Sequence, residues 1–175
     1  MSTPAPETII PPGVEALGNQ QLWFVPAVAN AAAPTAAELS AGFPILCSMT
    51  SGFNAAGEQA TTERWRACAA QATTALGPVS ITIEALEYVY DPQAPDSDNY
   101  EAYAELTQGR TGFLIDRRGK GYTEAPASGD VVDVYPVRFG FRNRVVNTPG
   151  ESSEFRVSQA VSVTGPVVQD AVIAA

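Results

Sequence analysis

The sequence predicts a mainly β fold, an antiparallel β-sandwich or barrel with one or two short flanking α-helices. Several segments alternate apolar and polar residues with the two-residue period of a half-buried strand. Helical spacing occurs in only two short segments, and the strands follow one another without a regular alternation of strands and helices. That pattern favours hairpin connections and therefore an antiparallel sheet.

The first half begins with a segment that cannot form a regular helix. Residues 1–20 are rich in proline and predict an extended N-terminal arm, with a disordered tail as the alternative. Thr35 with Glu38 three residues later has the pattern of a capping box, so a short helix should begin there and end at Gly42. The other expected elements are a strand at Gln21–Ala29, a strand-like segment at Phe43–Met49, a polar loop at Thr50–Gln59, a return strand at Thr61–Ala70 and a second loop ending near Pro78.

The second half is expected to hold longer strands. Val79–Tyr90 predicts a strand whose alternation changes phase midway, which either a bulge near Ala85 or burial of both faces would explain. Tyr100–Gln108 has helical spacing and precedes Gly109, a residue type that often ends helices. Further strands are expected at Arg110–Arg117, Asp130–Val146 and Phe155–Val163, with a polar loop at Arg118–Gly129 and turns at Asn147–Glu151 and Thr164–Pro166.

The strand at Asp130–Val146 concentrates positive charge on one face. A strict two-residue repeat separates its side chains into two sets. The apolar set, which we expect to face the core, is Tyr135, Val137, Phe139 and Phe141. The basic set on the opposite face is Arg138, Arg142 and Arg144.

Charge is also segregated along the chain, whose net charge is -9. Residues 67–109 contain acids but no Lys or Arg, whereas residues 110–156 contain most of the basic residues. Pairing within the subunit would explain this, at about 0–1 kcal/mol per exposed pair. Self-association is the other explanation, in which the basic face of one copy meets the acidic face of the next, head to tail. We hypothesise that the arginines of the strand pair with acids of a neighbouring subunit, drawn from Glu84, Glu87, Glu101 and Glu105.

The same acidity argues against tight binding of nucleic acid, because phosphates are bound by a surplus of Lys and Arg. An acidic surface repels DNA, which suits a protein that DNA must pass without sticking.

Residue types that perform catalysis are scarce. The chain has no histidine, the commonest general base and metal ligand. Its single lysine, Lys120, lies in a glycine-bracketed turn where we expect it to be solvated, unlike a catalytic lysine. Glu84 with Glu87, or Asp96 with Asp98, could form a glycosidase-like pair, but a solvated acidic face explains them more simply. We therefore predict no enzyme, no cofactor and no metal site.

Two cysteines, Cys47 and Cys68, are expected to be free and partly buried thiols, with a disulfide as the alternative. The N-terminus lacks the basic and then apolar pattern of a secretory signal. No apolar run approaches the roughly 20 residues of a membrane-spanning helix, so we expect no membrane insertion.

Four stretches carry a resemblance to a known family. They are WFVPAVANAAAPTAAELSAG near the start, IEALEYVYDPQ at residues 83–93, GDVVDVYPVRFG at 129–140 and VTGPVVQD at 163–170. Together they resemble the major tail protein, or tail tube protein, of bacteriophages with long non-contractile tails (siphovirus type), especially those that infect actinobacteria. The stretches occur in the family's order and span most of the chain from Leu22 to Asp170.

The resemblance implies a structural virion protein with the phage tail tube fold. Family members form hexameric rings that stack into a tube, and strands from each subunit join into an inner barrel with an acidic lumen for DNA ejection. Rings stack through an N-terminal arm, a long hairpin loop and C-terminal segments. By position, the counterparts here are residues 1–20, about 50–62 and 167–175, around a domain at 21–166. The residues expected at ring stacking are Ile9, Ile10, Phe53, Asn54 and Glu58.

The partners that the resemblance implies are further copies of the chain, a tape measure protein and a tail terminator. Genomic DNA would pass through the lumen without specific binding, and the tail would be assembled in the host cytoplasm. Two alternatives remain open from the residues. One is another virion ring protein, such as a tail terminator or head–tail connector, which forms single rings. The other is a monomeric carbohydrate-binding or hydrolytic β-sandwich.

Overall fold

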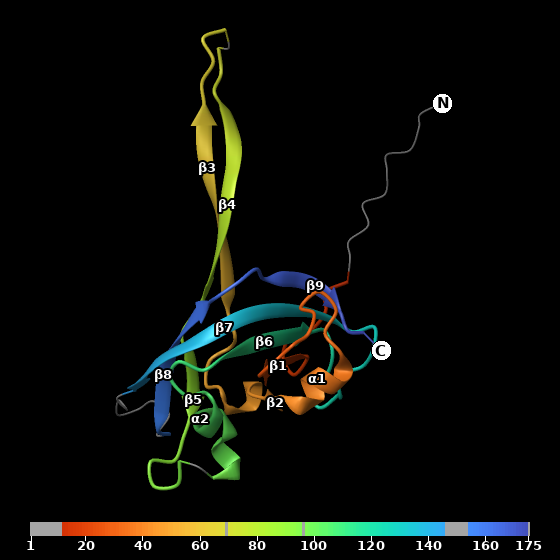
Figure 1. The fold of residues 1–175 in the computed structure, drawn as a ribbon, viewed down its shortest axis with the longest axis vertical. Coiled ribbons are helices and arrows are strands. Elements are labelled where there is room, and N and C mark those ends of the chain that lie inside the picture. The colour runs from red at the N-terminus through yellow and green to blue at the C-terminus, as the bar shows by residue number, and fades with distance from the viewer. Residues whose placement is uncertain (1–11, 69, 96, 146–153, 175) are drawn as a thin grey trace.

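A computed structural model describes residues 12–68, 70–95, 97–145 and 154–174. These residues form a curled antiparallel sheet with two short helices, and one long two-stranded hairpin projects from it (Figure 1). Strands make up 47% and helices 11%, which confirms the predicted mainly β fold. In the described part of the chain, no helix has the length and apolarity needed to cross a membrane.

The main sheet has a continuous path of six strands. Its spatial order is β2 (Phe43–Pro44), β1 (Gln20–Val25), β6 (Thr111–Arg118), β7 (Val131–Arg144), β8 (Arg156–Val163) and β5 (Leu86–Val89). β9 (Val168–Val172) pairs with the first part of β7, whereas β8 pairs with the second part. Both pairings are antiparallel, so the long strand β7 holds two separate partners along one edge.

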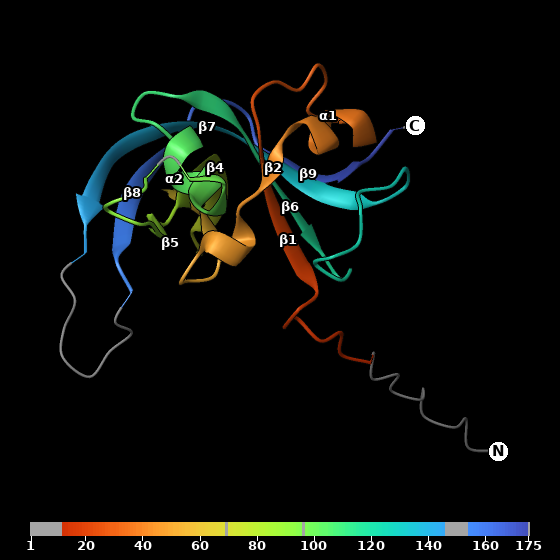
Figure 2. The ribbon, with the colours of Figure 1, turned by 90° about the horizontal axis from the view of Figure 1, so that it is seen from below.

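Two hydrophobic clusters pack against the main sheet, one on each face. β1 illustrates the division, because Leu22 and Phe24 belong to one cluster while Trp23 and Val25 belong to the other. The first cluster includes Ala102 of α2 (Glu101–Glu105), and the second includes Leu39 of α1 (Ala36–Ala41). Seen from below, β7 and β8 curl around α2, and α1 lies beside β9 (Figure 2).

The capping box predicted for the first helix is confirmed. The Glu38 amide donates to Thr35 Oγ1 at 3.2 Å, and the Thr35 amide donates to Glu38 Oε2 at 2.8 Å. Gly42 ends α1 as predicted, and a Cβ at this position would lie 2.3 Å from the Phe24 carbonyl oxygen. The second predicted helix is shorter than expected, since a 3-10 turn at Asp98–Tyr100 leads into α2, which ends at Glu105.

The two predicted loops after Met49 are largely wrong. β3 (Ala55–Arg64) covers the second half of the first segment, β4 (Thr73–Ile83) covers most of the second, and the two strands form the projecting hairpin. All but the first residue of β3 are exposed, so burial imposes no apolar alternation on this strand for a sequence pattern to reveal.

Three strand predictions also need correction. Of the expected return strand Thr61–Ala70, only residues 61–64 are strand, and they are the end of β3, whereas the return strand is β4. Only Phe43–Pro44 of the segment Phe43–Met49 is a strand, and a 3-10 turn at Leu46–Ser48 follows. Short apolar runs do not distinguish strands from other buried segments. The single strand expected at Val79–Tyr90 is two, because β4 ends at Ile83 and β5 begins at Leu86. The predicted phase change near Ala85 marks this break.

Candidate assembly surfaces

The β3–β4 hairpin is amphipathic, although neither strand belongs to the main sheet. The pairing register places Ile83, Ile81, Val79 and Leu76 on one face, opposite Ala55, Gly57, Gln59 and Thr61. The other face carries polar and small residues, including Glu58 opposite Ser80 and Thr62 opposite Ala75. The hairpin therefore carries an apolar row, which we define as Leu76, Val79, Ile81 and Ile83.

The apolar row leads out of the core into solvent. Ile83 is 4% exposed and Ile81 is half-buried, but Val79 is 60% and Leu76 is 72% exposed. Trp65, just beyond the end of β3, is 71% exposed. Several large exposed apolar side chains on one projecting element are typical of an interaction surface.

Both outer edges of this hairpin lack a strand partner among the described residues, where β3 and β4 pair only with each other. Isolated two-stranded hairpins are at best marginally stable in water. Unpaired edges are also templates for pairing with another chain. The hairpin thus offers two edges and one apolar face to a partner.

The second half of β7 contains a bulge that overturns part of the predicted pattern. The register shifts between Phe139, which pairs with Val161, and Arg142, which pairs with Gln159. Three residues of β7 therefore match two of β8, and the extra residue reverses the alternation. Tyr135, Val137 and Phe139 are buried as predicted, but Phe141 is 63% exposed, so its predicted core position is wrong.

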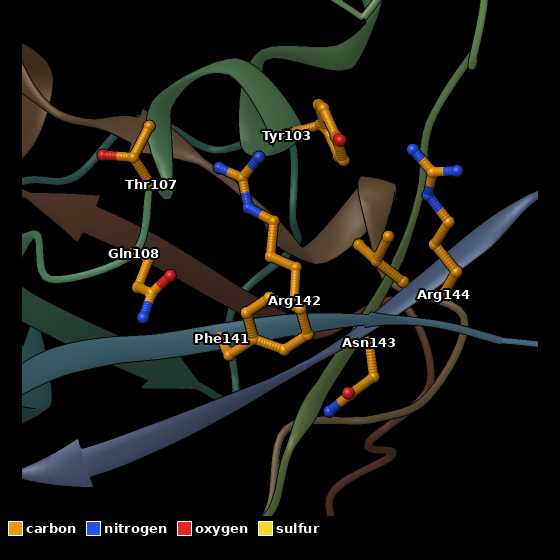
Figure 3. Close-up of a pocket in the computed structure, with 8 residues that line it drawn as sticks. Tyr103, Thr107, Gln108, Phe141, Arg142, Asn143 and Arg144 are labelled. Carbon is orange, nitrogen blue, oxygen red and sulfur yellow. The ribbon is translucent and has the colours of Figure 1, made fainter.

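The bulge also separates the three arginines. Arg138 is exposed on the outer face, whereas Arg142 and Arg144 lie after the bulge and line one pocket together with Tyr103 of α2 (Figure 3). Arg142 Nε donates to the Leu106 carbonyl at 3.1 Å, and its guanidinium lies 4.3 Å from the Tyr103 ring centroid. One terminal nitrogen of Arg142 is buried without a hydrogen-bond partner among the described residues. The arginines thus do not share one face.

Near Arg142, the side chain of Gln159 makes polar contacts inside the core. Gln159 is completely buried, accepts a hydrogen bond from the Tyr88 hydroxyl at 2.7 Å and donates to the Leu106 carbonyl at 2.8 Å. Burial raises the pKa of Tyr88 to about 12, although the nearby positive charge of Arg142 acts in the opposite direction. Tyr88 is therefore a neutral hydrogen-bond donor at physiological pH.

Glu105 and Glu87, two of the predicted acids, lie beside basic residues of the same subunit. Glu105 forms an ion pair with Arg110, and Glu87 lies 3.7 Å from Arg156. The side chains of Glu84 and Glu101 are exposed. The acidic and basic segments of the sequence therefore meet in part within one copy of the chain.

The predicted stacking residues occupy different environments. Phe53 is buried, with its ring 5.4 Å from the Tyr135 ring, so it belongs to the core. Asn54 is exposed and Glu58 lies on the polar face of the hairpin. Ile9 and Ile10 lie outside the described residues. The C-terminal segment includes β9, whose Ala171 is buried in the second cluster, so its described part belongs to the main sheet.

A buried ionic cluster went unnoticed in the sequence. Arg117 is 1% exposed and its guanidinium lies 2.9 Å from the Asp130 carboxylate, which Lys120 also contacts. Arg117 further donates to the carbonyls of Gly121 and Glu124. The cluster fixes the loop between β6 and β7. In the sequence, the signal that could have indicated this cluster is Asp130, an acid at the start of a predicted strand.

The cysteines and acids of the described residues form no candidate metal centre. Cys47 and Cys68 are both free, as predicted, but both are exposed and not partly buried. Each lies outside the main sheet, Cys47 in the 3-10 turn after β2 and Cys68 in the connection between β3 and β4, so neither is enclosed by the core.

Comparison with known proteins gives one family. The sequence matches the family described as phage tail tube protein over residues 8–175, nearly the whole chain. Among curated proteins, none matches the sequence.

Proposed function

The chain belongs to the phage tail tube protein family, and we propose that its copies close into hexameric rings that stack into the tail tube. The family makes the chain a structural component of the virion tail that assembles with itself into a tube. The ring, its six subunits, the siphovirus type of tail and assembly in the host cytoplasm are parts of the proposal. A structural role also suggests that the chain is not an enzyme.

The observation that carries the proposal is the hairpin. In a monomer, the projecting hairpin would leave Leu76, Val79 and two strand edges exposed to solvent, which favours association with another chain. Edge pairing with hairpins of neighbouring copies would satisfy the backbone groups and extend the ribbon into a closed barrel. The polar face with Glu58 would then line the lumen, and the apolar row would face the surrounding protein.

The net charge of -9 supports a conduit function. DNA moves through a tube only if the wall does not hold its phosphates, and carboxylates in the wall, such as that of Glu58, repel phosphates. We therefore assign the tube to passage of genomic DNA during ejection, without specific binding. A tape measure protein inside the tube and a tail terminator at its end would be the other partners.

Contacts between neighbouring subunits of a ring would use the charges of β7. Arg138 and Arg144 are exposed, as are the acids Glu84 and Glu101, so these residues could meet across copies. Arg142 contacts α2 of its own subunit and would act by holding Arg144 in place. Reversing Arg138 and Arg144 together to Glu should prevent rings from forming. Unchanged assembly of this double variant would refute the ring contact.

Electron microscopy of the purified chain tests the whole proposal. Concentrated samples should form tubes of uniform bore, and light scattering should show growth with concentration. Single rings that never stack would instead indicate a tail terminator or connector. A persistent monomer that binds or cleaves a glycan would indicate a carbohydrate-active β-sandwich. Either result would contradict the proposed tube.

A further inference from the structure

The tip of the hairpin has the composition of a binding anchor. Trp65 is 71% exposed and stands between Arg64 and Arg66, both exposed. No acid occurs from Trp65 through Ile83, although Glu63 precedes Arg64, so the tip carries two arginines against one glutamate in an acidic protein. Trp and Arg are the residue types most enriched among those that dominate binding energy at interfaces.

A pocket at the far end of the molecule combines aromatic and acidic residues. It has a volume of about 360 Å³, near the lower end of the roughly 300–1,000 Å³ typical of pockets that bind small ligands. Its aromatic lining comes from Tyr90, Tyr100 and Phe155, and its acidic residues are Asp91 and Glu154. Aromatic rings arranged edge to face or stacked attract one another, and arginines bind both aromatic faces and carboxylates.

The aromatic walls of the pocket are preorganised. Tyr90 is buried and stacks on Tyr103 with ring centroids 4.7 Å apart. Its amide donates to the Phe155 carbonyl at 3.1 Å, and the Phe155 ring lies edge-on at 6.5 Å. Phe155 is nevertheless 57% exposed, so more than half of its side chain remains accessible to a partner although its position is fixed. Little ordering would be needed on binding.

The tip and the pocket lie at opposite ends of the long axis. Figure 1 shows the hairpin tip at one end, with the start of β8 and the end of β5 at the other. One copy therefore cannot insert its own tip into its own pocket. A contact between the tip of one copy and the pocket of the next is head to tail, and such contacts repeat along a filament.

We infer that the Trp65 tip of each subunit inserts into the Tyr90–Tyr100–Phe155 pocket of a subunit in the next ring. Arg64 and Arg66 then lie against the carboxylates of Asp91 and Glu154 at the rim. This inference rests on the proposed tube, and it adds the acceptor site and the anchor of ring stacking.

Substitution of the anchor is the first test. Trp65→Ala should still form rings, but the protein concentration at which tubes appear should rise at least tenfold by light scattering and electron microscopy. Tyr122→Ala, which removes an aromatic side chain that is 48% exposed and lies at neither site, is the matched control and should polymerise like wild type. Tubes of Trp65→Ala at the wild-type concentration would overturn the inference.

Crosslinking tests the location directly. In a Cys47→Ser/Cys68→Ser background, Ala67→Cys at the tip is combined with Gln93→Cys beside the pocket, both at exposed positions, and a short bismaleimide is added. Assembled tubes should give a ladder of linked subunits, whereas the control pair Ala67→Cys with Tyr122→Cys should give none. Equal linking of both pairs, or no linking of the first pair in tubes that do form, would overturn the inference.

The two proposals fail in different ways. If wild-type protein forms tubes but neither test behaves as expected, the acceptor pocket is wrong and the tube stands. If wild-type protein forms neither rings nor tubes at any concentration, the proposed function itself is wrong.

Discussion

Arg117 shows how this acidic chain tolerates a buried cation. Its guanidinium has a carboxylate partner in Asp130 and the carbonyl oxygens of one loop, and it lies 5.1 Å from the Trp23 ring centroid. A buried charge is tolerated when it is paired and hydrogen-bonded. One nitrogen, Nε, lacks a partner among the described residues. The cluster therefore serves to hold the β6–β7 loop more than to add net stability.

The first prediction concerns Asp130→Asn. It should lower the free energy of unfolding by about 3 kcal/mol at neutral pH, because it breaks a buried ion pair. Burial alone would raise the pKa of Asp130, but hydrogen bonds from Lys120 and Arg117 outweigh burial and hold that pKa below its usual value. A carboxyl with a lowered folded pKa stabilises the fold above its unfolded pKa, about 3.9, and this contribution is lost as the pH falls through the folded pKa.

Urea unfolding at several pH values measures this effect. The difference between wild type and Asp130→Asn should be full at neutral pH and shrink below about pH 3.9. Glu58→Gln on the exposed hairpin is the control and should change stability by less than about 0.5 kcal/mol. A difference that is the same at neutral and acid pH would show that the charge of Asp130 is not responsible.

At the scale of the element, the bulge in β7 gives one strand two functions. Before it, Tyr135 and Val137 fill the core, and after it the same face carries Arg142, which packs against α2, and the exposed Arg144. Gln159 of β8 holds this junction, since its amide also donates to the Gly140 carbonyl at 3.1 Å. Gln159 thus joins β5, β7 and the end of α2.

The second prediction is that Gln159→Leu destabilises the subunit by at least about 2 kcal/mol. The substitution leaves the Tyr88 hydroxyl without its acceptor and the Gly140 carbonyl without a donor, and each unsatisfied buried group costs roughly 1–3 kcal/mol. Thermal and urea unfolding measure the loss. Ser162→Ala, at an exposed position of the same strand, should have little effect. Equal stability of the two variants would contradict the role of Gln159.

The elements that could be predicted from the sequence are those whose alternation is imposed by the core. β1, β6, β7 and β8 lie within a few residues of their predicted ranges, as does the capped helix α1. β3 could not be found, because it is exposed on both faces within a subunit. Along β4 the apolar alternation is present, but Gly77 and Pro78 interrupt it.

The arginine face of β7 was mispredicted for a local reason. A strict repeat assumes a regular strand, and a single extra residue at a bulge exchanges the two faces. Gly140 was the available signal, since glycine within a strand often marks a bulge or a close backbone approach. A Cβ at this position would lie 3.1 Å from the Ala160 carbonyl oxygen.

The third prediction separates folding from assembly in the hairpin. Leu76→Ser with Val79→Ser removes the exposed part of the apolar row, so the stability of the subunit should stay within about 0.5 kcal/mol of wild type. Assembly into tubes should be lost, because the same side chains would be buried between copies. Ser80→Ala with Thr82→Ala on the opposite face is the control. Loss of subunit stability without loss of assembly would contradict this division.

At the scale of the whole molecule, the fold leaves uncovered the surfaces that a tube would cover. The core is closed from both faces of the main sheet, while the hairpin, the basic tip and the acidic aromatic pocket lie outside it. Opposite charges at the two ends of the long axis give each subunit a direction. This difference between the two ends is what the proposed head-to-tail contact requires.

The last prediction concerns the backbone amides of the hairpin, whose burial on assembly can be measured by hydrogen exchange. In the subunit, the amides of β3 and β4 that point away from their shared ladder have no strand partner among the described residues, so they should exchange fast. In the tube they should become protected, because pairing between neighbouring hairpins would bond them. Amides shared by β6 and β7 are paired within the subunit and should be protected in both states. If the hairpin amides exchange equally fast in tubes and subunits, the hairpins do not pair, and another element must build the wall.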